Sequence, residues 1–382
     1  MNLELTEEQT AVRELAADFT DREIVPHAAE WDRAEQVDLG IVRKLGKLGF
    51  LGLTLPEEYG GSGGDHLAYC LVLEELGRGD SSVRGIVSVS LGLVGKSVNS
   101  FGTEEQKRHW LPRLTSGEAL ACFALTEPGT GSDAANLTTR AVRDGDDWLI
   151  TGSKTFITNG TWAEVALVFA RTGEPGHRGV TAFLVPTDSP GFGRRLIHGK
   201  LGLRGQATAE LTFDGVRVPD SARLGAEGKG FTVAMAALAK GRMSVAAGCV
   251  GIARACLEAA VKYAGEREQF GKPIASHQLV QELISDIAVD VDAARLLTWR
   301  VADHIERGLP FATESSVAKL YAGEAAVRAA NNALQVFGGY GFIDEYPVGK
   351  YLRDARVMTL YEGTSQIHKL LIGRSLTGIS AF

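Results

Sequence analysis

The chain has 382 residues, of which 45% are hydrophobic and 23% are charged, and its formal net charge is −7 at pH 7. This length allows two or three domains, and the composition is ordinary for a soluble globular protein. The negative balance excludes the basic footprint of a nucleic-acid-binding protein. The opening residues carry no basic segment or long apolar stretch, and no run of about twenty uncharged apolar residues occurs. We therefore expect a cytoplasmic protein without a membrane span.

The cysteines and histidines form no metal-ligand pattern. Cys70, Cys122, Cys249 and Cys256 show no CxxC spacing, and the eight histidines form no HxxxH pair. We expect neither structural disulfides nor a metal site.

The first third of the chain is predicted to be helical. Thr6-Glu7-Glu8-Gln9 and Thr103-Glu104-Glu105-Gln106 are both capping boxes, and apolar residues follow each at helical spacing. A glycine cluster at residues 60–64 marks a loop between them. We place an N-terminal α-helical domain at residues 1–119.

The pattern changes near residue 120. Short β-prone runs separated by Asp-Gly, Thr-Gly-Ser and Pro-Gly signals occur at 148–151, 165–169, 180–185, 210–213 and 216–218. They predict a small antiparallel β-domain at residues 120–227.

Helical periodicity returns after Gly230. Apolar residues recur every three or four positions over 250–264 and 284–305. Long helices with one apolar stripe need partners, so a helical bundle is predicted at residues 228–382, and the fold class is α+β.

Near the C-terminus the chain reads Tyr361-Glu362-Gly363-Thr364-Ser365-Gln366. A carboxylate removes a proton from carbon only when it is partly desolvated and aimed, and glycine beside it allows a ligand to approach closely. The same string also fits a plain helix start, with a glutamate in the first turn.

Four segments together resemble the acyl-CoA dehydrogenase family over nearly the whole chain. The segments are Leu125-Thr126-Glu127-Pro128-Gly129-Thr130-Gly131-Ser132-Asp133, Thr155-Phe156-Ile157-Thr158-Asn159-Gly160, Arg267-Glu268-Gln269-Phe270-Gly271-Lys272-Pro273 and Tyr361-Glu362-Gly363-Thr364. The resemblance implies an N-terminal α-helical domain, a middle antiparallel β-domain and a C-terminal four-helix bundle. It also implies FAD as cofactor, an acyl-CoA substrate, an electron-transfer flavoprotein as partner and a homotetramer built as a dimer of dimers.

The first segment is suited to cradle an anion, because its proline and glycines let backbone N–H groups converge. In isolation the string favours a surface turn between strands. The resemblance implies that Thr126 and Ser132 contact FAD and that Phe123 lies near the flavin.

The second segment suits a strand that ends in a tight Asn-Gly turn, in which Phe156 would be an ordinary core residue. The resemblance implies instead that Phe156 lies against the isoalloxazine and that the Thr158 hydroxyl hydrogen-bonds flavin N5. Relatives often carry Trp where this chain has Phe, which keeps the stacking but loses the indole N–H.

The third segment can bind a dinucleotide, since Arg267 can pair with a diphosphate and Phe270 can pack on an adenosine. Arg267 is also consistent with a solvated charge at a helix end. The resemblance implies that the FAD of a neighbouring subunit is contacted by Arg267, Phe270, Gln335 and Gly339.

The resemblance gives Glu362 the role of catalytic base. It would remove the α-proton of an acyl thioester while the β-hydrogen leaves as hydride to N5, giving a trans-2-enoyl thioester. The Glu362 N–H and an FAD ribityl hydroxyl would bind the thioester oxygen. Some relatives carry the base at the position of Gly241, which cannot act as one.

Residues around the base complete the implied site. Tyr361 would supply an apolar wall of the substrate pocket, and Thr364 and Gln366 would supply polar anchors for FAD. Arg242 matches a CoA-contacting arginine, although it also fits a charge on a helix surface.

Arg84 and Ser88 are one helical turn apart and can both face a substrate pocket. Glutaryl-CoA dehydrogenases carry Arg and Ser at similar places to bind the distal carboxylate of a dicarboxylic acyl chain. Those enzymes usually have His-Asp where this chain has Ser365-Gln366. The alternative is that Arg84 is a solvent-exposed or salt-bridged arginine near a helix start.

The sequence thus predicts an FAD-dependent dehydrogenase of a short or branched acyl-CoA. The alternatives are a dicarboxylic, glutaryl-like acyl-CoA or a carrier-protein-bound acyl thioester as substrate, and O2 as electron acceptor. A helical scaffold without catalysis is the alternative from another class.

Overall fold

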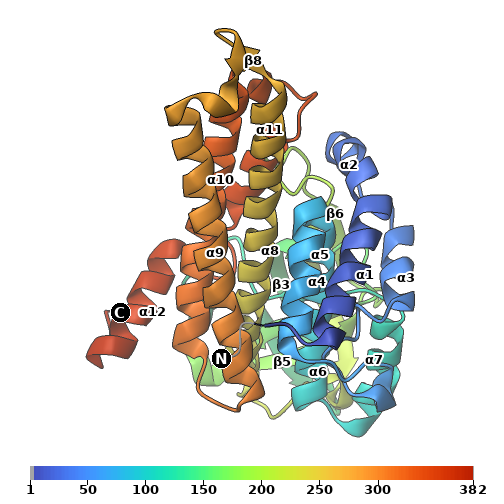
Figure 1. Ribbon diagram of the computed structural model, residues 1–382. Helices are drawn as coiled ribbons and strands as arrows, with labels where there is room; N and C mark the ends of the chain where they lie inside the picture. The colour runs from blue at the N-terminus through green and yellow to red at the C-terminus, as the bar shows by residue number, and fades with distance from the viewer. Residues whose placement is uncertain (1–3, 382) are drawn as a thin grey trace.

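The computed structural model describes residues 4–381 (Figure 1). Its N-terminal part is helical, as predicted, and both capping boxes are formed: Gln9 N–H donates to Thr6 Oγ1 at 3.1 Å, and Thr103 is paired with Gln106 in the same way. The helices are α1 (Glu7–Glu23), α2 (Ala28–Ala34), α3 (Gly40–Lys47), α4 (His66–Gly79), α5 (Ser81–Val87), α6 (Lys96–Phe101) and α7 (Glu104–Thr115).

A π-helical segment, Ser88–Gly95, joins α5 directly to α6. Its backbone is wider than an α-helix, and such segments are frequent at functional sites. The segment is almost wholly buried and contacts α8 and β1. The segment therefore lies at the boundary between the helical and β parts of the protein.

The middle of the chain forms one seven-stranded sheet. The strands are β1 (Ala121–Ala124), β2 (Arg140–Asp144), β3 (Asp147–Thr158), β4 (Val165–Arg171), β5 (Val180–Pro186), β6 (Phe192–Leu196) and β7 (Thr208–Pro219). Their order is β1-β4-β2-β3-β7-β6, with β5 paired to the other side of β4.

Two details of the sheet differ from the prediction. Most neighbouring strands are antiparallel, but β4 runs parallel to both β1 and β2. The predicted runs 210–213 and 216–218 are a single strand, β7, because β3 pairs along both and absorbs Asp214-Gly215 as a register shift.

The C-terminal part consists mainly of long helices that lie side by side (Figure 1). They are α8 (Gly230–Glu266), α9 (Gln278–Glu306) and α10 (Ala312–Phe337), followed by the shorter α11 (Val348–Val357) and α12 (Ser365–Thr377). The predicted apolar stripes lie in α8 and α9, where Ile287, Val291, Ala294 and Val301 are buried. The strands β8 (Glu268–Gln269) and β9 (Lys272–Pro273) form a hairpin at one end of these helices, and α12 projects sideways from the half farther from this hairpin (Figure 1).

Helix α8 is more apolar than a helix with a single apolar stripe. By length and composition alone it could cross a membrane, with a mean hydropathy of 1.5 over its most apolar window. However, 72% of that window is buried inside the protein, against α4, α9 and α10. Its composition is accounted for by its position as the central core helix.

Candidate active site

A cavity of about 910 Å³ lies where α5, the π-helical segment, the sheet, α8 and the segment before α12 meet. It brings together predicted residues from five parts of the chain. Those that line it are Arg84, Ser88, Phe123, Thr126, Ser132, Phe156, Thr158, Arg242, Tyr361 and Glu362.

Glu362 lies in a tight turn between α11 and α12. Its φ is +52° and that of Gly363 is +98°, both in the left-handed region, which costs a non-glycine residue energy. Thr364 is the N-cap of α12, and its Oγ1 accepts a hydrogen bond from Ile367 N–H at 3.2 Å. Glu362 therefore lies outside the helix, and the alternative that it occupies a first helical turn is wrong.

Glu362 is half-buried as a residue, and one of its carboxylate oxygens is enclosed within the protein. Its Oε2 is shielded from solvent and has no hydrogen-bond partner among residues 4–381. Burial raises its pKa to about 7, against the opposing charges of Arg84, Lys319 and Arg242. A carboxylate with a pKa near neutrality is half ionised at working pH and strong enough to take a proton from carbon.

The backbone N–H of Glu362 is also free. Within the described part of the chain it donates to no protein acceptor. The same residue thus presents a hydrogen-bond donor and a carboxylate, as enolate chemistry beside a carbonyl requires.

Gly241 makes room for this carboxylate. A Cβ built on Gly241 would overlap Glu362 Oε2 and would fall 2.6 Å from Leu93 Cδ2. The position implied for the base in some relatives is therefore adjacent to Glu362 in space, and a side chain there would displace the carboxylate.

The segment 125–133 is held in place by Glu127, which is 4% exposed. Lys154 Nζ donates to Glu127 Oε1 at 2.9 Å, and the N–H groups of Thr138 and Thr139 donate to the same carboxylate at 2.6 and 2.8 Å. A Cβ on Gly131 would meet nothing within 4 Å, so this loop faces open space. The segment is an exposed turn between β1 and β2, as the alternative had it, and its residues Thr126, Gly131 and Ser132 also line the cavity.

The sheet presents an aromatic surface to the same cavity. Phe156 is 68% exposed with a φ of +58°, and it is therefore not the core residue of the alternative interpretation. Two residues on, Thr158 Oγ1 accepts a hydrogen bond from Gln206 Nε2 at 3.0 Å, which leaves the hydroxyl hydrogen free to donate elsewhere. An exposed ring and a free donor beside an open glycine loop fit a flavin.

Arg84 is buried, at 1% exposure, and is not the solvent-exposed arginine of the alternative. It donates to Ser88 Oγ at 3.4 Å, Met358 Sδ at 3.6 Å and Tyr361 Oη at 2.5 Å. No carboxylate among residues 4–381 lies within ion-pair distance, and Nε has no partner. A guanidinium with five N–H donors thus keeps unused capacity at the cavity wall.

Arg242 is also buried, so the interpretation as a helix-surface charge is wrong. It is 9% exposed, donates to Ser316 Oγ at 3.3 Å, and leaves Nε without a partner in the described part of the chain. Burial lowers its pKa.

The remaining predicted residues do not line this cavity. Arg267, Phe270 and Gly339 line a second cavity, of about 650 Å³, near the β8–β9 hairpin, and Phe270 is 94% exposed. Gln335 and Gln366 are exposed, and Thr364 is engaged in capping α12. One chain does not bring these six residues to the cavity that contains Glu362.

Sequence reasoning missed three residues that the fold brings to the site. Gln206 holds Thr158, Lys319 Nζ donates to Gly363 O at 2.6 Å, and His368 lies beneath Gly363. Lys319 had a detectable signal, because it lies on the buried face of α10 with Ser315, Ala322 and Ala326. Gln206 lies in an irregular loop and had none.

Three family models match the chain in order. They are the acyl-CoA dehydrogenase N-terminal domain at residues 6–118, the middle domain at 122–216 and the C-terminal domain at 228–377.

Individual proteins agree with these matches. An acyl-CoA dehydrogenase of Bacillus subtilis (strain 168) is 43% identical over 98% of this chain and 100% of the relative. The structure of butyryl-CoA dehydrogenase from Megasphaera elsdenii is 39% identical, covers 98% of this chain and 100% of its own, and has a TM-score of 0.96. A glutaryl-CoA dehydrogenase from Mycobacterium smegmatis, in complex with FADH2, is 37% identical over 99% and 96% of the two chains, with a TM-score of 0.95.

Full-length matches at this identity, on a fold that gathers an unpartnered glutamate, an exposed aromatic ring and an open glycine loop around one cavity, leave a single conclusion. This chain belongs to the acyl-CoA dehydrogenase family of FAD-dependent oxidoreductases.

Proposed function

We propose that the protein dehydrogenates a short acyl-CoA between its α and β carbons, giving the trans-2-enoyl-CoA, with Glu362 as the base. The observation that carries the proposal is Glu362 itself, whose buried Oε2 and whose N–H both lack a partner among the residues that the structure describes. The similarity to butyryl-CoA dehydrogenase supports the short acyl chain.

In the proposed reaction the thioester oxygen accepts a hydrogen bond from the Glu362 N–H, which makes the α-proton more acidic. The Glu362 carboxylate then takes that proton. Leu93, Phe231 and Leu238 contribute apolar wall to the cavity and exclude water from the carboxylate. FAD, when bound, supplies the acceptor for the hydride that leaves the β carbon.

On the same proposal the cofactor rests between the sheet and the loop 125–133. Phe156 offers its exposed face for stacking, and the Thr158 hydroxyl is free to donate because Gln206 already occupies its oxygen. Thr126 and Ser132 contribute hydroxyl donors from the loop.

An anaerobic titration with butyryl-CoA tests the proposal. The oxidised flavin absorbance should be lost in the wild type. Glu362→Gln should still bind the thioester but reduce its flavin at least about 10³-fold more slowly, because an amide cannot take the proton. Exposed Glu345→Gln is the matched control. Normal reduction by Glu362→Gln would exclude the assigned base, and a flavin that no acyl-CoA bleaches would favour the scaffold alternative.

Arg84 favours a second candidate, dehydrogenation of a dicarboxylic acyl-CoA. Its buried guanidinium has no carboxylate partner within the described residues, although it lines the cavity with Ser88. A carboxylate at the far end of a substrate would relieve this unpaired charge. The similarity to a glutaryl-CoA dehydrogenase points in the same direction.

Arg84→Met separates the two candidates. If the substrate is dicarboxylic, the variant should lose about 100-fold or more in kcat/KM for glutaryl-CoA, the size of a lost charged hydrogen bond, while butyryl-CoA is affected less. If wild-type protein does not turn over glutaryl-CoA, or if both substrates fall equally, the dicarboxylic candidate is wrong.

The electron acceptor and the assembly are part of the same proposal. We infer an electron-transfer flavoprotein as the acceptor and a homotetramer as the working form. Arg267, Phe270 and Gly339, which lie outside this chain's own active-site cavity, would then complete the FAD site of a neighbouring copy. Sedimentation analysis with and without Phe270→Ala tests the assembly.

A further inference from the structure

Two hydrogen bonds connect α10 to the segment that carries Glu362. Lys319 Nζ donates to Gly363 O at 2.6 Å, and further along the same helix Glu324 Oε1 accepts from Ser365 Oγ at 2.6 Å. Both tethers reach the segment from the same helix and draw its polar groups toward the core. The opposite side of the turn, with the Glu362 N–H and carboxylate, is left to the cavity.

The turn needs such a tether because its backbone is unfavourable. Glu362 is held at a φ of +52° although it has a Cβ, and such strain persists only where the surroundings over-determine it. Gly363 cannot carry a side chain, because a Cβ there would lie 2.9 Å from His368 Nε2. The turn is therefore fixed between the His368 ring and the Lys319 ammonium.

Burial of the Lys319 ammonium costs free energy, and no ion pair among residues 4–381 offsets this cost. Lys319 is 1% exposed, and within the described part of the chain no carboxylate forms an ion pair with it. Burial lowers its pKa to about 8, so it carries its charge at neutral pH. A buried ammonium satisfied mainly by one carbonyl oxygen is unfavourable for stability alone.

We infer that Lys319 is a positioning residue for the reaction: it clamps the Gly363 carbonyl so that the N–H and the carboxylate of Glu362 face the substrate together, and its charge favours the ionised base. The inference rests on the proposed function of Glu362. Lys319 touches neither substrate nor cofactor in this role, because it acts through the turn.

Several groups around Glu362 affect the pKa of its carboxylate or face it without charge. Arg84 from α5, Arg242 from α8 and Lys319 from α10 all lower its pKa, whereas burial raises it. Tyr69 from α4 and neighbouring Tyr361 face it as neutral phenols, since burial raises the pKa of both. His368 from α12 stays neutral because burial lowers its pKa to about 3. Loss of Lys319 therefore removes one of three opposing cations.

Lys319→Met tests the inference in the FAD-loaded protein. Flavin reduction at saturating acyl-CoA should fall about 100-fold, as expected for a misplaced catalytic group, while KM changes little. The pH midpoint of the rate should move upward by about one unit, because fewer cations favour the carboxylate. Lys319→Arg keeps the charge and a donor, and should restore the pH midpoint and most of the rate.

Lys96→Met is the matched control. Lys96 is also a buried lysine, with no hydrogen-bond partner for Nζ among residues 4–381, but it lies over the Tyr69 ring and does not touch the turn. Its removal should leave the pH midpoint unchanged. Should Lys319→Met fail to fold, Lys319→Gln takes its place, and the upward shift is still required.

The inference is overturned if the Lys319 variants lose only thermal stability, with rate and pH midpoint unchanged per folded, flavin-loaded molecule. That outcome is distinct from failure of the proposed function. In the latter case Glu362→Gln is itself active, whereas failure of the clamp leaves Glu362→Gln inactive and Lys319→Met normal.

Discussion

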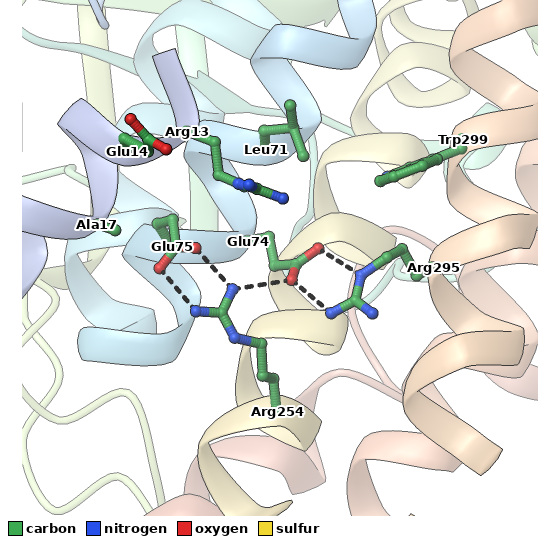
Figure 2. A pocket seen from close by; sticks show the side chains of 9 residues that line it. All are labelled: Arg13, Glu14, Ala17, Leu71, Glu74, Glu75, Arg254, Arg295 and Trp299. Atoms are coloured by element: carbon green, nitrogen blue, oxygen red, sulfur yellow. Dashed lines mark hydrogen bonds and ion pairs between the residues drawn. The ribbon is translucent and has the colours of Figure 1, made fainter. Parts of the chain in front are cut away.

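Two groups of buried and half-buried charges in this protein are arranged in opposite ways. The first, which we term the α4 network, consists of Glu74, Glu75, Arg254 and Arg295 at the junction of α4, α8 and α9 (Figure 2). The second, which we term the site charges, consists of Arg84, Arg242, Lys319 and Glu362 around the active-site cavity.

In the α4 network every charge has partners. Arg254 lies between the two glutamates, 2.6 Å from Glu75 and 3.1 Å from Glu74, and Arg295 grips Glu74 at 2.8 Å (Figure 2). Burial lowers the pKa of Arg254, but the hydrogen bonds and charge of Glu75 outweigh it and the net pKa is raised. The small cavity beside the network, of about 430 Å³, is lined by these four charged residues together with Arg13, Glu14 and Trp299.

Among the site charges none is paired with another within the described residues. Glu362 shows the consequence, because burial raises its pKa to about 7 even though three cations surround it. Charges that are buried and paired hold helices together, whereas charges that are buried and unpaired are available to a ligand. Pairing, more than burial, therefore separates the structural group from the one proposed to be catalytic.

Breaking the α4 network should give the largest loss of stability. Glu75→Leu leaves Arg254 and Arg78 without their shared carboxylate, so we expect a loss of about 3 kcal/mol, the lower end for breaking a buried ion pair. Thermal unfolding measures it, with flavin reduction per folded molecule unchanged. Asp292→Asn removes a carboxylate that is 78% exposed and pairs with Arg295 at the edge of the network, and it should cost under about 1 kcal/mol. Equal losses in the two variants would contradict the comparison.

Crowding the site should do the reverse, lowering the rate with little effect on stability. Gly241→Ala places a methyl group against the Glu362 carboxylate, and we expect flavin reduction to fall about 100-fold. Gly265→Ala on the same helix meets nothing within 4 Å, so it should keep the full rate. A fully active Gly241→Ala protein would show that the carboxylate does not need this space.

The smallest effect over the measured pH range is expected at His368, the neutral side chain next to the Glu362 turn, and it concerns the pH dependence of stability. Burial lowers the pKa of His368 from 6.5 to about 3, so the folded protein stays neutral there while the unfolded chain takes up a proton. Stability from this site is complete above pH 6.5 and is lost as pH falls toward 3, by at most about 1.4 kcal/mol per pH unit. As the pH is lowered from about 7 to about 5, the thermal unfolding midpoint of His368→Gln should therefore fall less steeply than that of the wild type. Exposed His109→Gln should match the wild type, and an unchanged slope in His368→Gln would contradict the assignment.

Features set by neighbouring residues could be predicted from the sequence. The two capping boxes and the apolar stripes of α8 and α9 lie where their spacing indicated, because these signals depend on residues within a few positions of one another. The parallel pairing of β1 with β4 could not be predicted, since it joins segments about forty residues apart and leaves no local signal.

The same distinction between local and long-range features applies to the candidate site. Resemblance to a family supplied Glu362, Phe156 and Thr158, and the fold brings all three to one cavity. The contact between Arg84 and Tyr361 spans 277 positions and gives no sign in either local sequence. Gln206 was missed for the same reason, because a glutamine in a loop acquires a role only when folding places it beside Thr158.

By itself the sequence determined the order of helical and β segments, their capping and the identity of the chemical groups, because short-range hydrogen bonds and periodicity decide these. Only the tertiary structure decided which buried charges are paired. Pairing depends on atoms from distant segments meeting within ion-pair distance. In this protein folding satisfies the α4 network and leaves Glu362 unpartnered, with Lys319 beneath the turn that carries it.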